Sequence, residues 1–507
     1  MDMVKLDGER LTIEGIVDIA RKNARIAISP DSKKKILKSR EIIERMFRNR
    51  EVAYGVTTGI GELANVALTR EQAIDFSKNL IYSHAGGYGT ALEKETVRAA
   101  IASRINVLCK GVSGVRLEVA EFIAEMLNRE VTPVMYPASV GASGDLAPMA
   151  QAMLVPLGEG EAFYEGKKVS GGEALKMAGL KPIRYEIRDG LAVINGSNLM
   201  AGLGALEVYD ADMLIKTSEI AAAMTFEALK AVTVAFDADI LRLRGYKGGM
   251  DSADNIRRLI EGSQILKKQE RVQDAYSIRS TPQVVGAIRD SSKWVREQIE
   301  IELNSGADNP LFIPDEGKGR YLAGANFQGT PIALPLELLG ISLTTLSVLS
   351  ERRLNRLINP HLNLGLPSFL INGAGIYSGI MIPQYSAAFL VTENRVLSTP
   401  AAIGSIPTAA DQEDFVSMGT NTALKTRKIL DNTSGVIAIE LLAAAQALDL
   451  RGGEPGKGAK AAYNHVRKYV EFLDKDRPLY PDIETLTKLV KSGQILEAVE
   501  KTIGKLK

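Results

Sequence analysis

The chain has 507 residues, of which 45% are hydrophobic and 24% charged, a composition typical of a globular protein that buries a large core. Its 62 Lys and Arg residues balance 61 Asp and Glu residues, so there is no net field to attract nucleic acid or an anionic membrane. The single cysteine excludes an internal disulfide and a zinc site built from cysteines, and the opening residues contain no apolar run of signal-peptide length, so we expect a cytoplasmic protein.

Helical periodicity begins early in the chain. Apolar residues recur at helical spacing directly after Thr12, whose side chain is typical of a helix N-cap. Thr69 and Gln72 form a capping box that opens a second helix. A pair of glycines follows His84, so we expect this helix to end near that histidine and to leave its side chain facing a loop.

Strand signals are few and local. Residues 163–169 predict a small hairpin, and residues 311–322 predict another around two glycines. From about residue 202 the chain carries long apolar runs at helical spacing, several of them apolar nearly all round, which predicts burial on every side. These runs comprise residues 220–235, 331–353, 377–397 and 433–448.

These patterns predict a mainly α fold: a long-helix bundle core with a mixed, loop-rich N-terminal part and a few short hairpins. We place the division near residue 200, with residues 1–200 as the N-terminal part and residues 201–507 as the helical bundle core. Residues 331–350 are long enough and apolar enough to cross a bilayer, but Glu337 and two prolines favour a buried helix, so we expect no membrane segment. A single chain would struggle to bury so many helices that are apolar nearly all round, which favours association of subunits.

One stretch has an unusual composition. Residues 136–151 read "YPASVGASGDLAPMAQ", small residues with a single acid, Asp145, and they contain neither a phosphate loop nor a dinucleotide fingerprint. The sequence has no metal-binding spacing such as HExxH and no nucleophile elbow. Of the three histidines, His361 and His465 favour packing or surface roles, and His84 is the candidate for a site.

Other polar clusters interrupt the helical pattern, and each alone is more often a loop with satisfied side chains than a site. Together they supply a tyrosine for proton transfer, amides for orientation, an arginine for a carboxylate and a glutamate for a polar substrate tip. That set suits a small ligand resembling an amino acid. The clusters are "AYGVTTGIG", "INGSN", "QDAYSIRSTPQ", "GANFQGTP" and "DQEDFVSMG".

The motifs resemble those of the histidine/phenylalanine/tyrosine ammonia-lyase family, in family order over roughly residues 10 to 450. They are "YGVTTGIG", "SHAGGYG", "GASGDLAP", "INGSN", "QDAYSIR", "DNPLF", "GANFQGTP", "SERR" and "IPTAADQEDFVSMG". The resemblance implies that Ala142, Ser143 and Gly144 cyclise into methylidene-imidazolone, an electrophile made from the chain itself, with no external cofactor. Glycine lacks a Cβ, so its nitrogen can approach a carbonyl two residues back, and serine supplies the hydroxyl that leaves. Asp145 would assist proton movement or cap the helix that follows.

The resemblance also implies roles for single residues and a homotetrameric assembly. Tyr54 and Tyr276 match catalytic positions, and Arg279 matches the arginine that binds the substrate carboxylate through a planar fork. The remaining positions that match substrate or ring contacts are His84, Asn195, Gln273, Phe327 and Glu413.

The substrate is the most open question. His84 and Glu413 resemble the histidine type, which predicts conversion of L-histidine to urocanate. "NFQG" at residues 326–329 resembles the enzymes for other aromatic amino acids, Phe415 replaces a histidine usual after "QED", and Tyr88 is bulkier than that loop normally carries. Tyrosine or phenylalanine ammonia-lyase and an aromatic 2,3-aminomutase therefore stay open. A fumarase-type lyase is disfavoured because its Gly-Ser-Ser loop is absent, and a non-catalytic helical scaffold is the least favoured alternative.

Overall fold

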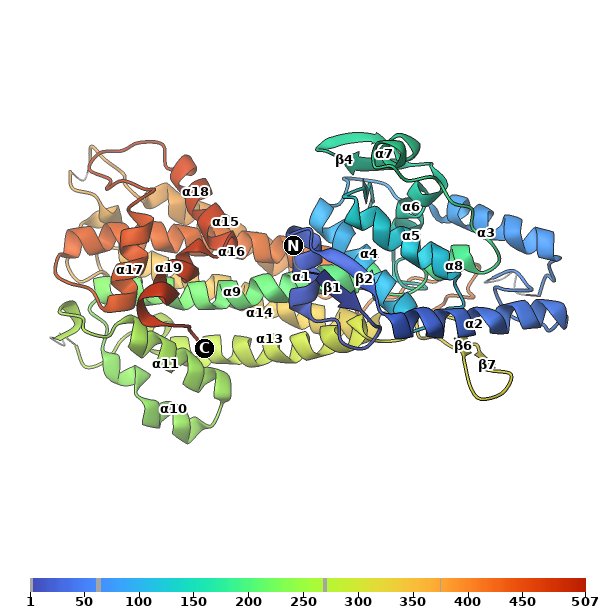
Figure 1. The fold of residues 1–507 in the computed structure, drawn as a ribbon. Helices are drawn as coiled ribbons and strands as arrows, with labels where there is room; N and C mark the ends of the chain where they lie inside the picture. The colour runs from blue at the N-terminus through green and yellow to red at the C-terminus, as the bar shows by residue number, and fades with distance from the viewer. Residues whose placement is uncertain (1–2, 61–64, 268–270, 374) are drawn as a thin grey trace. The chain divides into compact units, whose positions relative to one another are not determined.

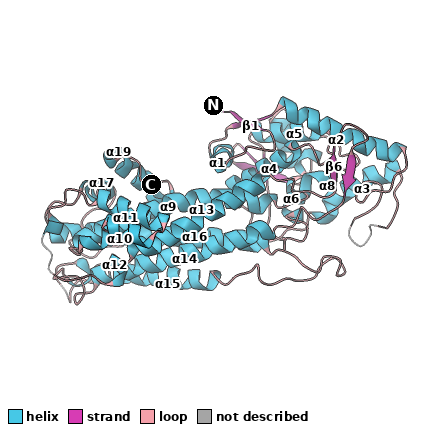
Figure 2. Cartoon of the chain, turned by 90° about the horizontal axis from the view of Figure 1, so that it is seen from below, coloured by secondary structure: helices cyan, strands magenta, loops and turns pink. Residues whose placement is uncertain are grey.

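The computed structural model describes residues 3–60, 65–267, 271–373 and 375–507 (Figure 1). Helices account for most of the described chain (Figure 2), which confirms the prediction of a mainly α fold. The chain divides into two compact units. The first comprises Met1–Tyr209, Val295–Glu337 and Pro400–Leu424, and the second Asp210–Trp294, Leu338–Thr399 and Lys425–Lys507. The expected domain division near residue 200 stays a prediction.

A short parallel strand pair lies at the beginning of the first unit. β1 (Met3–Leu6) pairs with β2 (Arg25–Ile28) in the register Met3 to Arg25, and α1 (Ile13–Arg21) connects the two strands. The Thr12 Oγ accepts a hydrogen bond from the Gly15 N–H at 3.1 Å, which confirms Thr12 as the N-cap of α1. The strands were not predicted, because four-residue strands that pair across a helix leave little local pattern.

Nearly all residues of α4 are buried within the first unit. α3 begins with the predicted capping box of Thr69 and Gln72 and ends at His84, so both of its predicted ends are confirmed. The helices are α2 (Pro30–Arg48), α3 (Arg70–His84), α4 (Lys94–Cys109), α5 (Leu117–Asn128), α6 (Leu146–Ala152), α7 (Gly171–Met177) and α8 (Asp189–Ile194).

Both predicted hairpins are confirmed. β4 (Glu161–Tyr164) and β5 (Lys167–Ser170) are antiparallel and lie beside α7 in Figure 1, and β3 (Thr132–Pro133) adds a third strand. β6 (Leu311–Ile313) pairs antiparallel with β7 (Arg320–Leu322).

The later part of the chain is built from long helices. Short 3-10 turns occur at Val155–Leu157, Thr233–Phe236, Ile265–Lys267 and Ser368–Leu370. The helices are α9 (Asn198–Ala228), α10 (Ala238–Arg244), α11 (Lys247–Leu259), α12 (Tyr276–Arg279), α13 (Thr281–Leu303), α14 (Thr330–Ile358), α15 (Met381–Leu397), α16 (Gly419–Arg451), α17 (Lys457–Val466), α18 (Tyr480–Lys491) and α19 (Gln494–Ile503).

Two of the predicted helix boundaries are wrong. The helix expected over residues 220–235 is the end of α9, which stops at Ala228 because Lys230 adopts a left-handed backbone with φ +49°. The helix expected from residue 377 begins at Met381, after Gly379, whose φ is +53°. α14 and α16 contain the predicted runs and extend beyond them.

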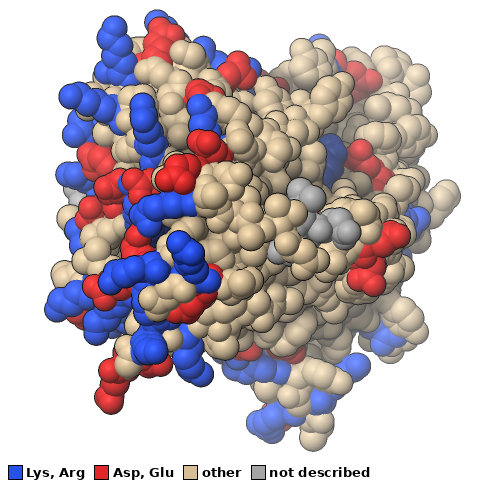
Figure 3. Space-filling model, turned by 90° about the vertical axis from the view of Figure 1, so that its right-hand side faces the viewer, with Lys and Arg blue, Asp and Glu red and all other residues tan. Residues whose placement is uncertain are grey.

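α14 and α16 are both long and apolar enough to span a bilayer. However, 72% of the apolar window of α14 and 89% of that of α16 are buried inside the protein, as in the core helices of soluble proteins. On the face drawn in Figure 3, basic and acidic side chains are interleaved, which agrees with the balanced charge of the sequence.

Candidate active site

Residues 138–145 form a loop whose end is fixed against residues 195–198. Gly144 and Gly196 pair as an isolated parallel bridge. The Gly196 N–H donates to the Ser143 carbonyl at 3.1 Å, and the Asp145 N–H donates to the Gly196 carbonyl at 2.9 Å. The Ser139 Oγ donates to the Gly144 carbonyl at 2.9 Å. The backbone on both sides of the Gly144 nitrogen is therefore held in place.

Glycine is required at two positions of this loop. Gly144 has φ +77°, and a Cβ there would lie 2.0 Å from the carbonyl carbon of Gly196. Gly141 has φ +78°, and a Cβ there would lie 2.0 Å from the Oγ of Ser417. Any other residue would need an unfavourable backbone and would also overlap its neighbour.

The atoms expected to join in ring closure are not engaged elsewhere. Within the described residues, the Gly144 N–H donates no hydrogen bond and the Ala142 carbonyl accepts none. Ala142 and Ser143 are half-buried, so the loop is neither packed into the core nor fully solvated. A fixed frame around an uncommitted amide and carbonyl fits the formation of methylidene-imidazolone from these three residues.

Asp145 occupies the N-cap position of α6, the helix that follows it, but its side chain makes no capping hydrogen bond there, so the capping role offered from the sequence is wrong. Its Oδ2 accepts hydrogen bonds from the Leu199 and Met200 N–H groups at 2.9 and 3.1 Å, in the first turn of α9, and its Oδ1 accepts one from the Thr420 Oγ1 at 2.6 Å. Burial raises the pKa of Asp145 to about 6 in spite of these three donors.

A second buried aspartate, Asp308, holds the 195–198 segment from the other side. Its Oδ1 accepts from Arg188 Nη2 at 2.8 Å and from Asn195 Nδ2 at 2.9 Å, and its Oδ2 accepts from Arg104 Nη2 at 2.7 Å. Arg104 Nη1 also donates to the Asn195 carbonyl at 2.6 Å. Burial acts to raise the pKa of Asp308, but the two guanidinium groups outweigh it and hold that pKa below its ordinary value.

These three charged residues were missed in the sequence. The available signal was Arg104 in the largely apolar run "AAIASRINVLC", because an arginine buried in such a run needs an acceptor. The "DNPLF" motif contains Asp308, but no local pattern links it to Arg104, 204 positions away.

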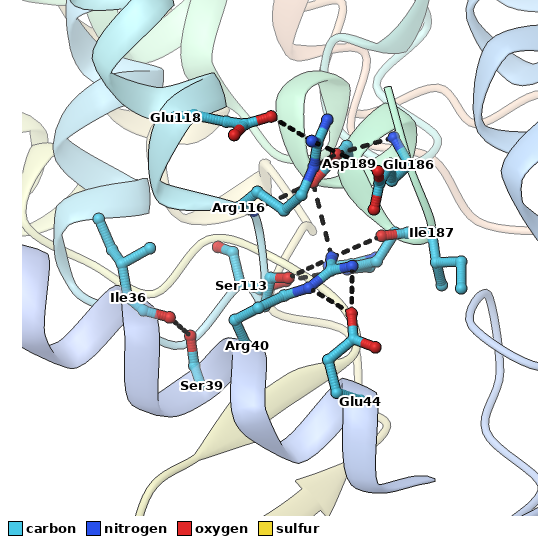
Figure 4. A network of polar contacts seen from close by, with 12 residues as sticks. Ile36, Ser39, Arg40, Glu44, Ser113, Arg116, Glu118, Glu186, Ile187 and Asp189 are labelled. Carbon is cyan, nitrogen blue, oxygen red and sulfur yellow. Dashed lines mark hydrogen bonds and ion pairs between the residues drawn. The ribbon is translucent and has the colours of Figure 1, made fainter. Parts of the chain in front are cut away.

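α8 delivers Asn195, which is its C-cap, and a polar network fixes the start of that helix (Figure 4). The Arg116 backbone N–H and Nε donate to the two carboxylate oxygens of Asp189 at 3.0 and 2.6 Å. Arg40 Nη1 lies 3.7 Å from the same carboxylate. Because Asp189 is the first residue of α8, the network anchors the helix on which Asn195 depends.

His84 is half-buried at the end of α3. Its Nδ1 lies 2.9 Å from the Leu80 carbonyl and 3.0 Å from the Ser83 Oγ. Because a carbonyl only accepts, Nδ1 carries the proton when it makes this bond, and Nε2 of the neutral ring remains an acceptor. Burial lowers the pKa of His84, while the Leu80 carbonyl and the Glu413 carboxylate act to raise it. His84 and Glu413 therefore interact electrostatically.

Glu413 is fixed by a tight turn that begins at Thr408. The two residues form an antiparallel bridge, and the Thr408 Oγ1 donates to Glu413 Oε2 at 2.8 Å. The same segment is attached to the 138–145 loop, because the Met418 N–H donates to the Val140 carbonyl at 2.8 Å. The carboxylate and the small-residue loop thus belong to one connected structure in the first unit.

Tyr54 and Phe327 also lie in the first unit, and both are half-buried. The Tyr54 N–H donates to the Tyr321 hydroxyl at 2.8 Å, which fixes the backbone that carries the phenol. Gln328 follows Phe327, and its Nε2 donates to the Phe415 carbonyl at 3.4 Å. Gln328 and Phe415, two of the positions that depart from the histidine-type pattern, therefore contact each other.

Gln273, Tyr276 and Arg279 belong to the second unit, around α12. Gln273 is exposed and Tyr276 is 72% exposed. The Arg279 guanidinium lies 4.7 Å from the centre of the Tyr276 ring. The Arg279 Nε is buried and has no hydrogen-bond partner among the described residues.

The remaining histidines occupy other surroundings. His361 is exposed, and the His465 ring packs 5.4 Å from the Tyr469 ring, which agrees with the surface and packing roles predicted for them. Throughout the ranges that the structure describes, no three His, Cys, Asp or Glu side chains gather as a metal site would require.

Comparison with known proteins gives matches over nearly the whole chain. Residues 11–468 match the aromatic amino acid lyases. A histidine ammonia-lyase of Caldanaerobacter subterraneus subsp. tengcongensis is 46% identical over 504 residues, which cover 99% of each chain. Among solved structures, tyrosine aminomutase from Streptomyces globisporus has a TM-score of 0.95 at 38% identity, covering 99% of this chain and 100% of that one. Histidine ammonia-lyase from Trypanosoma cruzi has a TM-score of 0.92 at 37% identity, covering 98% and 95%.

Proposed function

Because this chain belongs to the aromatic amino acid lyase family, we propose that it eliminates ammonia from L-histidine to give urocanate. The observation that carries this proposal is the 46% identity to a histidine ammonia-lyase over the full length of both chains. Membership of this family makes the protein a carbon–nitrogen lyase. The Glu413 carboxylate acts to raise the pKa of His84, so a carboxylate and an imidazole lie in the same part of the first unit, which further supports an imidazole as the group that the site binds.

An aromatic 2,3-aminomutase is the second candidate. The TM-score of 0.95 with a tyrosine aminomutase favours it. Gln328 and Phe415 depart from the histidine-type pattern, which leaves another aromatic substrate open. Backbone similarity carries less weight for the substrate than the side chains that meet it, because one fold accommodates different substrates. The histidine assignment therefore stands first.

Ala142, Ser143 and Gly144 are the residues that would form the methylidene-imidazolone of this family, without an external cofactor. When formed, the group supplies an electrophilic carbon that accepts electron density from the substrate. The positive φ of Gly144 and its uncommitted amide support this assignment. The Gly196 N–H holds the Ser143 carbonyl, and a donor there stabilises negative charge that develops on that oxygen.

The protein's own side chains orient the substrate and move protons. The Arg279 guanidinium binds the substrate carboxylate, for which its unpartnered Nε is suited. The His84 Nε2 accepts an N–H from the substrate imidazole, and the Glu413 carboxylate accepts the other or balances its charge. Tyr54 and Tyr276 act in proton transfer. Asn195, Gln273 and Phe327 contact the substrate or the ring.

We also propose a cytoplasmic homotetramer. α15 exposes an apolar face on which Ile382, Tyr385, Phe389 and Val396 recur at helical spacing and are 53–70% exposed. An exposed row of large apolar side chains marks a protein interface, and a second copy of the chain is the partner that the family supplies. The balanced charge of the sequence gives no net field that would attract nucleic acid.

The direct test is an assay of the purified protein with L-histidine. Urocanate should appear by its ultraviolet absorbance in step with released ammonium, whereas L-tyrosine and L-phenylalanine should react far more slowly. A protein that ignores histidine and converts another aromatic amino acid would overturn the substrate, and a β-amino acid product would identify the mutase.

Intact mass tests the prosthetic group independently of activity. Ring formation should remove two waters from the translated mass, and Ser143→Ala, which lacks the leaving hydroxyl, should not form the alkene. Glu413→Gln should lower kcat/KM for L-histidine at least tenfold while its mass still reports the ring. An unchanged rate in Glu413→Gln would exclude this carboxylate from the substrate pocket.

A further inference from the structure

The turn that carries Glu413 has a backbone that ordinary residues rarely adopt. Ala409, Ala410 and Asp411 have φ values of +50°, +54° and +65°, so three consecutive residues other than glycine lie in the left-handed region. Each of them is disfavoured because its Cβ approaches the following carbonyl oxygen. Such strain persists only where the surrounding contacts fix it, and it is concentrated at ligand sites. The turn therefore indicates a functional constraint on the residue that it presents.

The hydrogen bonds that close this turn join Thr408 to Glu413. The Thr408 N–H donates to the Glu413 carbonyl at 3.0 Å, and the Glu413 N–H donates to the Thr408 carbonyl at 3.2 Å. The Thr408 Oγ1 adds a third hydrogen bond, to Glu413 Oε2 at 2.8 Å. The segment that follows is held by Ser405, whose Oγ accepts from the Val416 N–H at 2.9 Å. The backbone and the carboxylate of Glu413 are therefore fixed together.

This arrangement gives the two carboxylate oxygens of Glu413 different surroundings. Oε2 accepts from the Thr408 hydroxyl, whereas within the described residues no hydrogen-bond donor lies against Oε1. Glu413 is half-buried, so part of its side chain can be reached by a ligand. The carboxylate also acts to raise the pKa of His84, so its charge reaches that imidazole. One oxygen is thus held by the chain, and the other is available to a ligand.

We infer that Thr408 is a positioning residue that, together with the left-handed turn, presents Glu413 Oε1 to the N–H group of the substrate's side chain. The inference rests on the proposed function, in which Glu413 meets the substrate imidazole. A glutamate side chain has several rotatable bonds, and holding it in place beforehand lowers the entropy that is lost when the substrate binds. Because only a donor can use this oxygen, the arrangement recognises an imidazole and not a phenyl ring. Thr408 therefore contributes to substrate choice without touching the substrate.

Steady-state kinetics with L-histidine test this role through Thr408→Val, which keeps the volume of the side chain and removes the hydroxyl. KM should rise about three- to thirtyfold, because the carboxylate regains its rotational freedom before binding. The value of kcat should change by less than about twofold, since the bound substrate and the transition state lose the same contact. Thr408→Ser keeps a hydroxyl, and its KM should stay within about twofold of that of the unchanged protein. A fall of kcat with an unchanged KM would overturn the inference.

A double-mutant cycle separates action through Glu413 from a general effect on folding. If Thr408 acts through the carboxylate, Thr408→Val should raise KM by less than about twofold in a Glu413→Ala background. An effect as large as in the unchanged background would mean that the threonine supports only the fold. The matched control is Thr502→Val, on the exposed face of α19, where the hydroxyl donates to the Ala498 carbonyl, and its KM should not change.

The left-handed turn offers a second, independent pair of variants. Ala410→Gly suits a φ of +54° and should keep KM within about twofold, whereas the branched Cβ of Ala410→Val disfavours this backbone and should raise KM as Thr408→Val does. Intact mass reports ring formation in each variant, and urea denaturation reports its folding. A folded Ala410→Val protein with an unchanged KM would show that the turn does not position Glu413.

Two ligands distinguish this inference from the proposed function. The ring of 3-(imidazol-4-yl)propionate carries an N–H donor, and the ring of 3-phenylpropionate carries none. By calorimetry, Thr408→Val should bind the first about three- to thirtyfold more weakly and the second equally well. If the unchanged protein forms its ring yet ignores L-histidine, the proposed function fails, whatever Thr408→Val does. If the unchanged protein converts L-histidine and Thr408→Val weakens both ligands equally, or neither, only the role of Thr408 fails.

Discussion

Asp145 and Asp308 are both fully buried in the first unit, and both hold the 195–198 region, yet their pKa values move in opposite directions. Asp145 meets two backbone N–H groups and a hydroxyl, and its pKa rises to about 6. Asp308 meets two guanidinium groups, and its pKa falls. Neutral dipoles do not offset the loss of hydration here, whereas two formal charges do. Burial alone therefore does not decide how an acid behaves.

Among substitutions around these two acids, removal of the Asp308 carboxylate should have the largest effect on the free energy of unfolding. Asp308→Ala leaves Arg104 and Arg188 buried without a counter-charge, which should lower the free energy of unfolding by about 3–5 kcal/mol. Urea denaturation at fixed protein concentration measures this. Asp315→Ala, at the exposed turn between β6 and β7, is the control and should lose only a small fraction of that. Equal losses would mean that the buried arginines find other partners.

The pH dependence of stability should carry opposite signs for the two acids. The pKa of Asp145 is raised in the folded protein, so the folded state binds more protons between about pH 4 and pH 6, and the stability it contributes falls as pH rises through that window. This amounts to about 3 kcal/mol for a shift of about two units. Asp145→Asn should reduce this fall in urea titrations across that range, and the fall that remains should include the contribution of Glu227, whose pKa burial raises to about 7.

Asp308 should behave in the reverse way. Its pKa is lowered, so its contribution is complete above the ordinary aspartate pKa and is lost as pH falls through the folded value. The stability of Asp145→Asn should therefore still decline toward strong acid. If Asp145→Asn shows the same fall of stability between pH 4 and pH 6 as the unchanged protein, Asp145 does not contribute to that window.

A smaller effect is expected from the hydroxyl on Asp145. Thr420→Val removes the donor at 2.6 Å without changing the volume, and it should cost about 1–2 kcal/mol at pH 7, where the carboxylate is ionised, and less at pH 5. Thr420→Ser keeps a hydroxyl at this position and serves as the control. A cost independent of pH would mean that the valine packs poorly and that the hydrogen bond contributes little.

The smallest effect on the free energy of unfolding is expected when the Asn195 amide, which donates to Asp308, is removed. Asn195→Ala removes one neutral donor, but Asp308 Oδ1 keeps Arg188 Nη2 at 2.8 Å and the Asn309 N–H at 2.7 Å. The free energy of unfolding should fall by about 1 kcal/mol or less. A loss as large as that of Asp308→Ala would show that the amide, and not the charge pair, holds this centre together.

The sequence predicted the elements whose signals are local. The capping box at Thr69, the end of α3 at His84 and both hairpins depend on residues within a few positions of one another. The β1–β2 pair was missed because its partners are 22 residues apart and each strand has only four residues. Local pattern therefore gives helix ends and turns, and does not give pairing across a helix.

The same limit applies to the candidate site. The small-residue loop was recognised from its composition, and its glycine requirement has a steric cause that sequence reasoning could anticipate. The capping role offered for Asp145 was wrong, because the partners of its carboxylate, Leu199 and Thr420, lie 54 and 275 positions away. Its part in proton movement stays a prediction. Buried charge pairs leave almost no trace in a single sequence.

The contact between Gly144 and Gly196 sets a limit on redesign. A methyl group on either residue would meet the other backbone or the Ala307 carbonyl at about 2 Å, so neither position tolerates change alone and no single compensating swap restores the fit. Directed evolution toward new amino acids should leave this pair untouched. Tyr88 and Phe415 are 89% and 62% exposed, so substitutions at these two positions should be tolerated where substitutions at the two glycines are not.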